Sequence, residues 1–208
     1  MPMPFGLPAP DPGFEIFVAS HGMTQGLSQS NGPQAIPRAY LRIGEVQVGG
    51  FWRNIDSPAA NGIAVVFARL SAKRGPTQLD VSALYRTRTG ARRPTMLHAW
   101  EIDTTLRRSF GRFAIRLNAE YAPREFELGR SLFVEVGPSF RVAKGTTLFA
   151  NLGRRERSGA PEYSAINVGI SRAVGQKLLI DARYYATDRS ELGPRYRGRL
   201  VFSARLSL

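Results

Sequence analysis

The stretch FAIRLNAEY, residues 113–121, alternates between two kinds of side chain. Its odd-numbered positions, from Phe113 to Tyr121, are all apolar, whereas Arg116, Asn118 and Glu120 occupy even-numbered positions. Successive side chains of a β-strand point to opposite faces, so this period of two predicts an amphipathic strand. The same alternation recurs in residues 79–85, 132–141 and 178–185. Because the pattern repeats along the chain, we predict an all-β fold.

Twelve segments of the chain show this alternation, and their boundaries are defined to within about 2 to 4 residues. They cover residues 13–23, 34–43, 45–55, 62–73, 78–87, 96–107, 112–122, 131–142, 146–154, 163–172, 177–187 and 195–208. In residues 62–73 both faces are apolar, and we choose the phase that places Arg69 and Lys73 on the polar face. Tight connections at Gly44 and at residues 74–76, 109–111, 143–145 and 174–176 alternate with longer polar ones.

Short turns at one rim and long loops at the other are typical of outer-membrane barrels. We therefore predict a transmembrane, antiparallel up-and-down β-barrel of about twelve strands, with both termini on the short-turn side. Strands of about 9 to 11 residues suffice to cross a bilayer when they are tilted. Residues 13–208 are expected to form this single domain, behind a Pro-rich tail at residues 1–12.

Aromatic side chains give a second indication of a membrane. Five of them share the apolar face near the long-loop end of their segments: Trp52, Tyr85, Tyr121, Tyr184 and Tyr196. Such a row is typical of an interfacial girdle, and Phe113 and Phe140 are placed to contribute to a second girdle near the short turns. The alternative is that aromatic residues simply favour strands, but this does not explain their shared height.

The formal net charge of +13 comes almost entirely from arginine, because 26 of the 29 basic residues are Arg. One interpretation is the base composition of the source genome. The other is a surface or channel that binds anions, because guanidinium stays charged and presents a planar fork of donors. In a soluble barrel the polar face would look outward. In a membrane it must line the lumen, because an Arg facing lipid at the midplane costs about 2 to 4 kcal/mol.

The membrane interpretation makes the polar face the wall of a pore. The predicted pore-lining residues are Arg116, Arg141, Arg183, Arg197, Arg199, Arg205, Asp80, Glu101, Asp103, Glu120, Glu135 and Asp181. The acids on neighbouring segments are expected to be counter-charges of a salt-bridge network, since buried charges persist when they are paired. General acid–base chemistry or a divalent cation is the alternative for them. The wall with Arg195, Arg197, Arg199 and Arg205 has fewer acids nearby and should be net positive.

The two ends of the chain give indications of where in the cell the protein is located. Residues 1–12 lack the basic start and apolar run of a signal peptide, so an exported form is expected to have lost its signal. The last segment alternates up to Leu208. Such a C-terminal strand is what the barrel insertion machinery of the outer membrane recognises, although it usually ends in Phe or Trp.

The N-terminal third resembles a known family over residues 17–56. The similarity lies in SHGMTQGLSQ (20–29), GPQA (32–35) and GGFWRNID (49–56), which resemble the opening of the TorF-type family of proteobacterial outer-membrane porins. In that family the first strand commonly carries an aromatic residue and an Arg where this chain has Thr24 and Gln25. The resemblance implies a barrel in the Gram-negative outer membrane with a pore function.

The residues of the chain give little support for catalysis or for a bound cofactor. The chain has no Cys, and His21 and His98 are its only histidines, so thiolate sites and histidine-rich metal sites are not expected. SQSNG at residues 28–32 resembles the His-x-Ser-Asn-Gly string of outer-membrane phospholipases, but Ser28 stands where the base is needed. We interpret it as a polar loop. We predict no enzyme, no cofactor and no metal.

Three functions are therefore compared. The first is a porin-like barrel whose arginine-rich lumen lets small anionic solutes diffuse passively. The second is a closed structural barrel that packs against membrane partners or copies of itself, because twelve strands lie between the filled eight-stranded and the open sixteen-stranded barrel. The third is a soluble basic β protein that binds nucleic acid, but most aromatics lie away from the basic face that this mode requires. The expected partners are outer-membrane lipid, small anions and the insertion machinery, with no nucleic acid.

Overall fold

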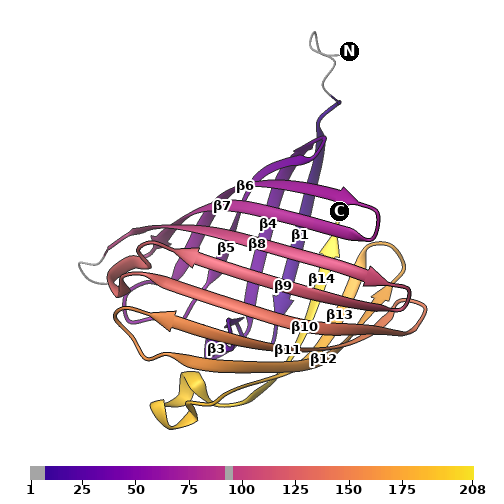
Figure 1. Cartoon of the computed structure of the whole chain (residues 1–208). Helices are drawn as coiled ribbons and strands as arrows, with labels where there is room; N and C mark the ends of the chain where they lie inside the picture. The colour runs from indigo at the N-terminus through magenta and orange to yellow at the C-terminus, as the bar shows by residue number, and fades with distance from the viewer. Residues whose placement is uncertain (1–7, 92–95) are drawn as a thin grey trace.

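The structure is a computed structural model that describes residues 8–91 and 96–208. In these residues twelve antiparallel strands close into a barrel, in the order β1-β14-β13-β12-β11-β10-β9-β8-β7-β6-β5-β4 (Figure 1). The strands are β1 (Asp11–Ala19), β4 (Gln34–Ile43), β5 (Val46–Asn54), β6 (Gly62–Arg74), β7 (Thr77–Thr89), β8 (His98–Phe110), β9 (Phe113–Ala122), β10 (Ser131–Ala143), β11 (Thr146–Arg157), β12 (Tyr163–Val174), β13 (Leu178–Thr187) and β14 (Arg199–Ser207). The predicted fold is confirmed.

The barrel closes by pairing its first strand with its last. Ile16 of β1 lies opposite Leu206 of β14, while the other edge of β1 pairs with β4. Each of the twelve barrel strands therefore has two partners, and closure leaves no unpaired edge in this sheet over the described residues. None of the described residues belongs to a helix long and apolar enough to cross a membrane.

The two rims differ as the sequence predicts. Each of five short turns contains a glycine with φ between 55° and 74°, a backbone conformation that other residues adopt at a cost. These are Gly44, Gly75, Gly111, Gly145 and Gly175. The long connections gather at the opposite rim (Figure 1). Because Asp11 pairs with Arg42 next to the turn at Gly44, the first strand begins at the short-turn rim.

The apolar face of the wall points outward. In β6, Val66 is 65% exposed whereas its neighbour Val65 is 2% exposed. The phase chosen for residues 62–73 is therefore correct, with Arg69 on the inner face. Val65 packs inside the barrel with Ile63, Phe67 and Leu84. The lumen thus has one apolar wall on β6 and β7, and its other walls are mostly polar.

Most of the predicted girdle residues lie on the outside of the barrel. Trp52, Tyr121 and Tyr184 are exposed near the loop rim. Tyr85 contacts Trp100 at 4.8 Å between ring centroids and stacks on His98 at 5.3 Å. At the short-turn rim Phe113 and Phe140 are exposed and lie opposite each other, and the Phe110 ring is 6.3 Å from the Phe113 ring.

Tyr196 is the exception, and the prediction for it was wrong. It lies in a 3₁₀ turn (Pro194–Tyr196) and packs inside the barrel against the buried cluster of Leu27, Tyr163 and Ala165. Its outward assignment assumed that the last strand begins at residue 195, whereas β14 begins at Arg199.

Two further boundaries differ from the prediction. The first strand starts at Asp11, within the predicted tail, and ends at Ala19 rather than at residue 23. The chain then leaves the wall and forms a separate hairpin of β2 (Met23–Thr24) and β3 (Leu27–Ser28). Residues 1–7 of the predicted tail and residues 92–95 of a predicted loop lie outside the described residues.

Candidate functional site

The predicted pore-lining residues lie on the inner face of the wall, with one exception. Eleven of the twelve are on strands: Asp80 on β7, Glu101 and Asp103 on β8, Arg116 and Glu120 on β9, Glu135 and Arg141 on β10, Asp181 and Arg183 on β13, and Arg199 and Arg205 on β14. Arg197 was assigned wrongly to the strand, because it follows the 3₁₀ turn in the loop and is exposed. Arg141 is exposed at the short-turn rim.

The lumen contains a segment that the sequence did not predict there. We call residues 23–28, which comprise β2 and β3, the lumen hairpin; Figure 1 draws it between the walls of the barrel. The side-chain amide of Gln25 donates a hydrogen bond to Glu120, and the Tyr163 hydroxyl donates to the Gln25 carbonyl oxygen at 3.0 Å. Leu27 is 3% exposed. The hairpin therefore lies in the half of the lumen next to the long loops, which we call the loop half; the half next to the short turns is the short-turn half.

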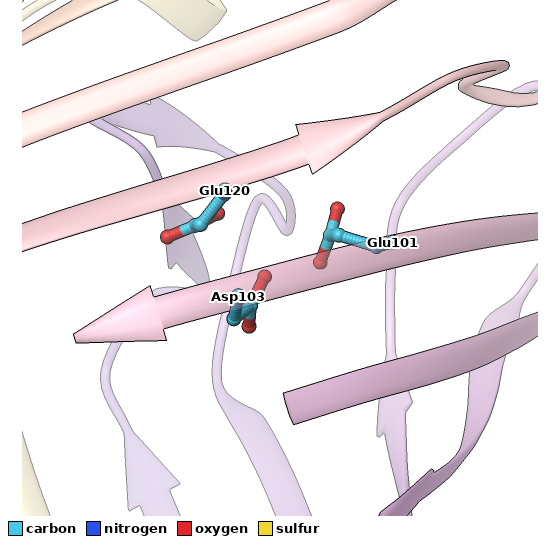
Figure 2. Close-up of side chains that lie close together, drawn as sticks. All are labelled: Glu101, Asp103 and Glu120. Atoms are coloured by element: carbon cyan, nitrogen blue, oxygen red, sulfur yellow. The ribbon is translucent and has the colours of Figure 1, made fainter. Parts of the chain in front are cut away.

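Three carboxylates gather on the inner face of β8 and β9, and one of them, Glu120, contacts the lumen hairpin. Glu101 and Asp103 on β8 and Glu120 on β9 have oxygens within 4.8 Å of one another, and Figure 2 shows the three side chains converging from two neighbouring strands. Glu101 forms a buried ion pair with Arg86, and Glu120 accepts hydrogen bonds from Gln25 and Asn118. Carboxylate oxygens are ligands for hard cations. The ion pair of Glu101 with Arg86 agrees with the predicted salt-bridge network. Glu120 is held by neutral amides instead, and among the described residues neither Glu120 nor Asp103 forms an ion pair, so the network prediction was wrong for these two.

A second acidic centre comes from the loop between β9 and β10. Glu125 precedes a 3₁₀ turn (Phe126–Leu128) that dips toward the lumen, and its carboxylate meets Arg155 at 2.6 Å, Arg157 at 3.1 Å and Arg86 at 3.5 Å. Burial raises the pKa of this carboxyl, but Arg157, Arg155 and Arg86 outweigh burial, so the pKa lies below its ordinary value. Glu125 was not among the predicted residues, because it lies in a loop outside the period-two pattern.

The short-turn half is more open than the loop half. It contains cavities of about 440 Å³ and 520 Å³, and Arg205 contributes to the lining of both. By contrast, a cavity beside the lumen hairpin in the loop half measures about 150 Å³. The described interior is therefore narrow near the loops and wide near the short turns.

The charges of the short-turn half do not balance. Its ion pairs are Arg38 with Glu15 at 3.8 Å, Arg116 with Glu135, and Arg183 with Asp181 at 3.2 Å. Among the described residues, five cations that line the two larger cavities have no ion pair: Arg42, Arg69, Lys73, Arg107 and Arg205. Glu45 and Asp80 are the acids of these linings that are likewise without an ion pair. In these two linings the unpaired cations therefore outnumber the unpaired acids by five to two.

The fold is similar to that of solved outer-membrane proteins. No model of a known protein family matches the chain, and no curated protein matches its sequence. The chain is similar to the KdgM porin, with a TM-score of 0.67 and 8% identity over 94% of this chain and 99% of that one. Its TM-score is 0.52 with a loop-deletion mutant of OmpT from Vibrio cholerae, at 8% identity over 96% of this chain and 99% of that one.

The outer-membrane protein OpdK of Pseudomonas aeruginosa is also similar, with a TM-score of 0.51 and 10% identity over 86% of this chain and 58% of that one. The KdgM porin has also been solved in complex with disordered oligogalacturonate. At these identities the likeness concerns the fold. The architecture of this chain is that of outer-membrane porins.

Proposed function

We propose that this protein is a narrow porin of the Gram-negative outer membrane that lets small anionic solutes diffuse passively. The observation that carries the proposal is the group of unpaired cations around the two cavities of the short-turn half. Charge in a pore selects ions by their sign, and a guanidinium that has no internal carboxylate is free to bind a passing anion. Transport rather than catalysis is the activity that such a lumen supports.

The outer surface supports the membrane location. Apolar side chains along the strands are exposed, for example Val168, Leu200 and Phe202. A contiguous apolar surface of this kind needs a lipid or protein partner. The resemblance of residues 17–56 to the TorF-type porins and the fold of the KdgM porin support the same location. Recognition of β14 by the insertion machinery remains a prediction.

The orientation of the wall does not support binding of nucleic acid. That function requires the basic face of the sheet on the outside of the molecule. Here the apolar side chains of β6 are outside and Arg69 is inside.

A closed structural barrel is the second candidate. The lumen hairpin crosses the interior, and the cavity beside it is about 150 Å³. If the loop half of the lumen admits no solute, the barrel would serve as a scaffold for membrane partners or for copies of itself.

The experiment that separates the two candidates is a planar-bilayer recording of the refolded protein under a salt gradient. We expect discrete conductance steps with a reversal potential that favours anions. Arg205→Glu should shift the reversal potential toward cations, because this side chain lines both large cavities. Arg189→Glu is the matched control, because it makes the same charge change at an exposed loop position. Verified insertion without conductance would favour the closed barrel.

A further inference from the structure

The lumen hairpin reaches the far side of the barrel from its own strand. It follows β1, and the side chain of Gln25 at its tip is hydrogen-bonded to Glu120 of β9. In the closed ring β9 is the sixth strand from β1 in both directions. This contact therefore spans the full bore.

Three other contacts hold the lumen hairpin from different sides. Arg53 of β5 donates to the Thr24 hydroxyl at 3.0 Å, and Tyr163 of β12 donates to the Gln25 carbonyl oxygen at 3.0 Å. Arg195, in the loop before β14, donates to the Ser28 carbonyl oxygen at 3.2 Å. A segment attached to β5, β9, β12 and this loop is fixed in place.

The tip of the hairpin also leaves no gap against β12. Gln25 and Gly26 have φ of 53° and 82°, which form the tight turn. A Cβ on Gly26 would lie 2.5 Å from the Cβ of Ala165, so only a glycine allows this approach. Leu27 is buried in the cluster with Tyr163 and Ala165. Solute is therefore confined to the other side of the hairpin, where the cavity measures about 150 Å³.

We propose that the lumen hairpin is a fixed strut that sets the size limit of the channel, with Gln25 and Gly26 as the residues that determine this limit. The inference rests on the proposed pore function, and it separates size selection from charge selection. The hairpin narrows the loop half, whereas Arg205 and the other unpaired cations of the two larger cavities lie in the short-turn half.

The test compares the wild-type protein with Gln25→Ala and Gly26→Val. Gln25→Ala removes the contact with Glu120, and Gly26→Val forces the tip away from Ala165. Single-channel conductance and liposome swelling with neutral sugars of increasing size are measured. Both variants should conduct more and admit a larger sugar, with an unchanged anion preference. Asn31→Ala is the matched control, because it removes a hydrogen bond of the same loop to Asp56 at an exposed position, and it should behave as wild type.

A cross-linking measurement tests the position of the hairpin even if Gln25→Ala or Gly26→Val does not fold. The chain has no cysteine, so Gln25→Cys combined with Glu120→Cys can be joined by a short bis-maleimide in the folded protein. Joining should lock the strut and keep the wild-type sugar limit.

The outcomes distinguish this proposal from the proposed function. If the wild type is silent and Gln25→Ala conducts, the strut is supported and passive diffusion by the wild type fails. Wild-type conductance and sugar limit in both variants would overturn the strut. Silence of all folded variants would also overturn it, because something else would then close the lumen. Absence of the bis-maleimide bridge would show that the hairpin does not cross the bore.

Discussion

Glu125 offers the sharpest test of the interior ion-pair network. Replacing it by Gln keeps the shape but removes the charge that faces three guanidinium groups. Arg86 keeps its pair with Glu101, and Arg157 is 11% exposed at its side chain. Arg155 is 1% exposed and loses its carboxylate partner. Leaving one buried charge uncompensated costs about 3 to 5 kcal/mol, so we expect Glu125→Gln to lower the free energy of unfolding by about 3 kcal/mol.

The measurement is urea unfolding of the protein in lipid or detergent, followed by the fluorescence of Trp52 and Trp100. Glu162→Gln is the matched control, because its pair with Arg154 is half exposed on both sides, at 51% and 50%. A surface pair of this kind contributes about 0 to 1 kcal/mol. A loss below about 1 kcal/mol for Glu125→Gln would show that water reaches Arg155, and would refute the buried network.

The dependence on pH gives this prediction a second readout. Arg157, Arg155 and Arg86 hold the pKa of Glu125 below its ordinary value in spite of burial. A carboxyl with a depressed pKa in the folded state stabilises the fold above its unfolded value of about 4.3, and this contribution is lost as the pH falls through the folded value. The stability gap between wild type and Glu125→Gln should therefore be full at pH 7 and shrink below about pH 4. A constant gap down to pH 2 would contradict the assignment.

Two further changes test the wall of the barrel. Val168 lies on the outer face near the middle of β12, so Val168→Arg would place a charge against lipid and should lower the free energy of unfolding in a bilayer by about 2 to 4 kcal/mol. The control is Gln78→Arg on the inner face, which should lower it by less than about 1 kcal/mol. Equal costs in lipid-based unfolding would argue against a lipid-facing wall. Gly137→Ala should cost about 1 to 3 kcal/mol, because its Cβ would lie 2.3 Å from the Ala150 carbonyl oxygen and 1.9 Å from Asn151 Oδ1. Unfolding equal to wild type would show that β10 and β11 can separate there.

The wall was predictable because each strand carries its own orientation signal. The alternation in residues 113–121 assigns the inside and outside of β9 without reference to any other strand, and a glycine marks each short turn. In residues 62–73 both faces are apolar, but the inner face could still be assigned because Arg69 and Lys73 avoid lipid. The last strand was extended too far because Arg195 and Arg197 continue the alternation numerically while the chain is still in a turn.

The lumen hairpin was not predictable, because its position depends on contacts that are distant in the sequence. Gln25 meets Glu120 across 95 positions and Tyr163 across 138. Residues 20–29 carry polar side chains and glycines, which also describe a solvated loop. The resemblance to the TorF-type family marked this segment, but the resemblance alone says nothing about where the segment lies. Glu125 was not predicted either, because it lies in a loop outside the period-two pattern.

The arginines are spread along the sequence, and the fold gives them different surroundings. In the loop half, Arg86 and Arg155 are paired with Glu101 and Glu125, and Arg195 holds the lumen hairpin. Of the predicted positive wall, Arg199 and Arg205 lie on β14, and neither forms an ion pair among the described residues. Arg205 lines both cavities of the short-turn half.

If charge and size are selected in different halves, the two properties should vary independently. Arg205→Glu should change the reversal potential and leave the sugar limit unchanged, whereas Gln25→Ala should do the opposite. The double variant should show both changes at full size, because sites that share no partner act additively. A change in ion preference in Gln25→Ala would mean that the strut itself carries part of the charge selection, and the division into halves would be wrong.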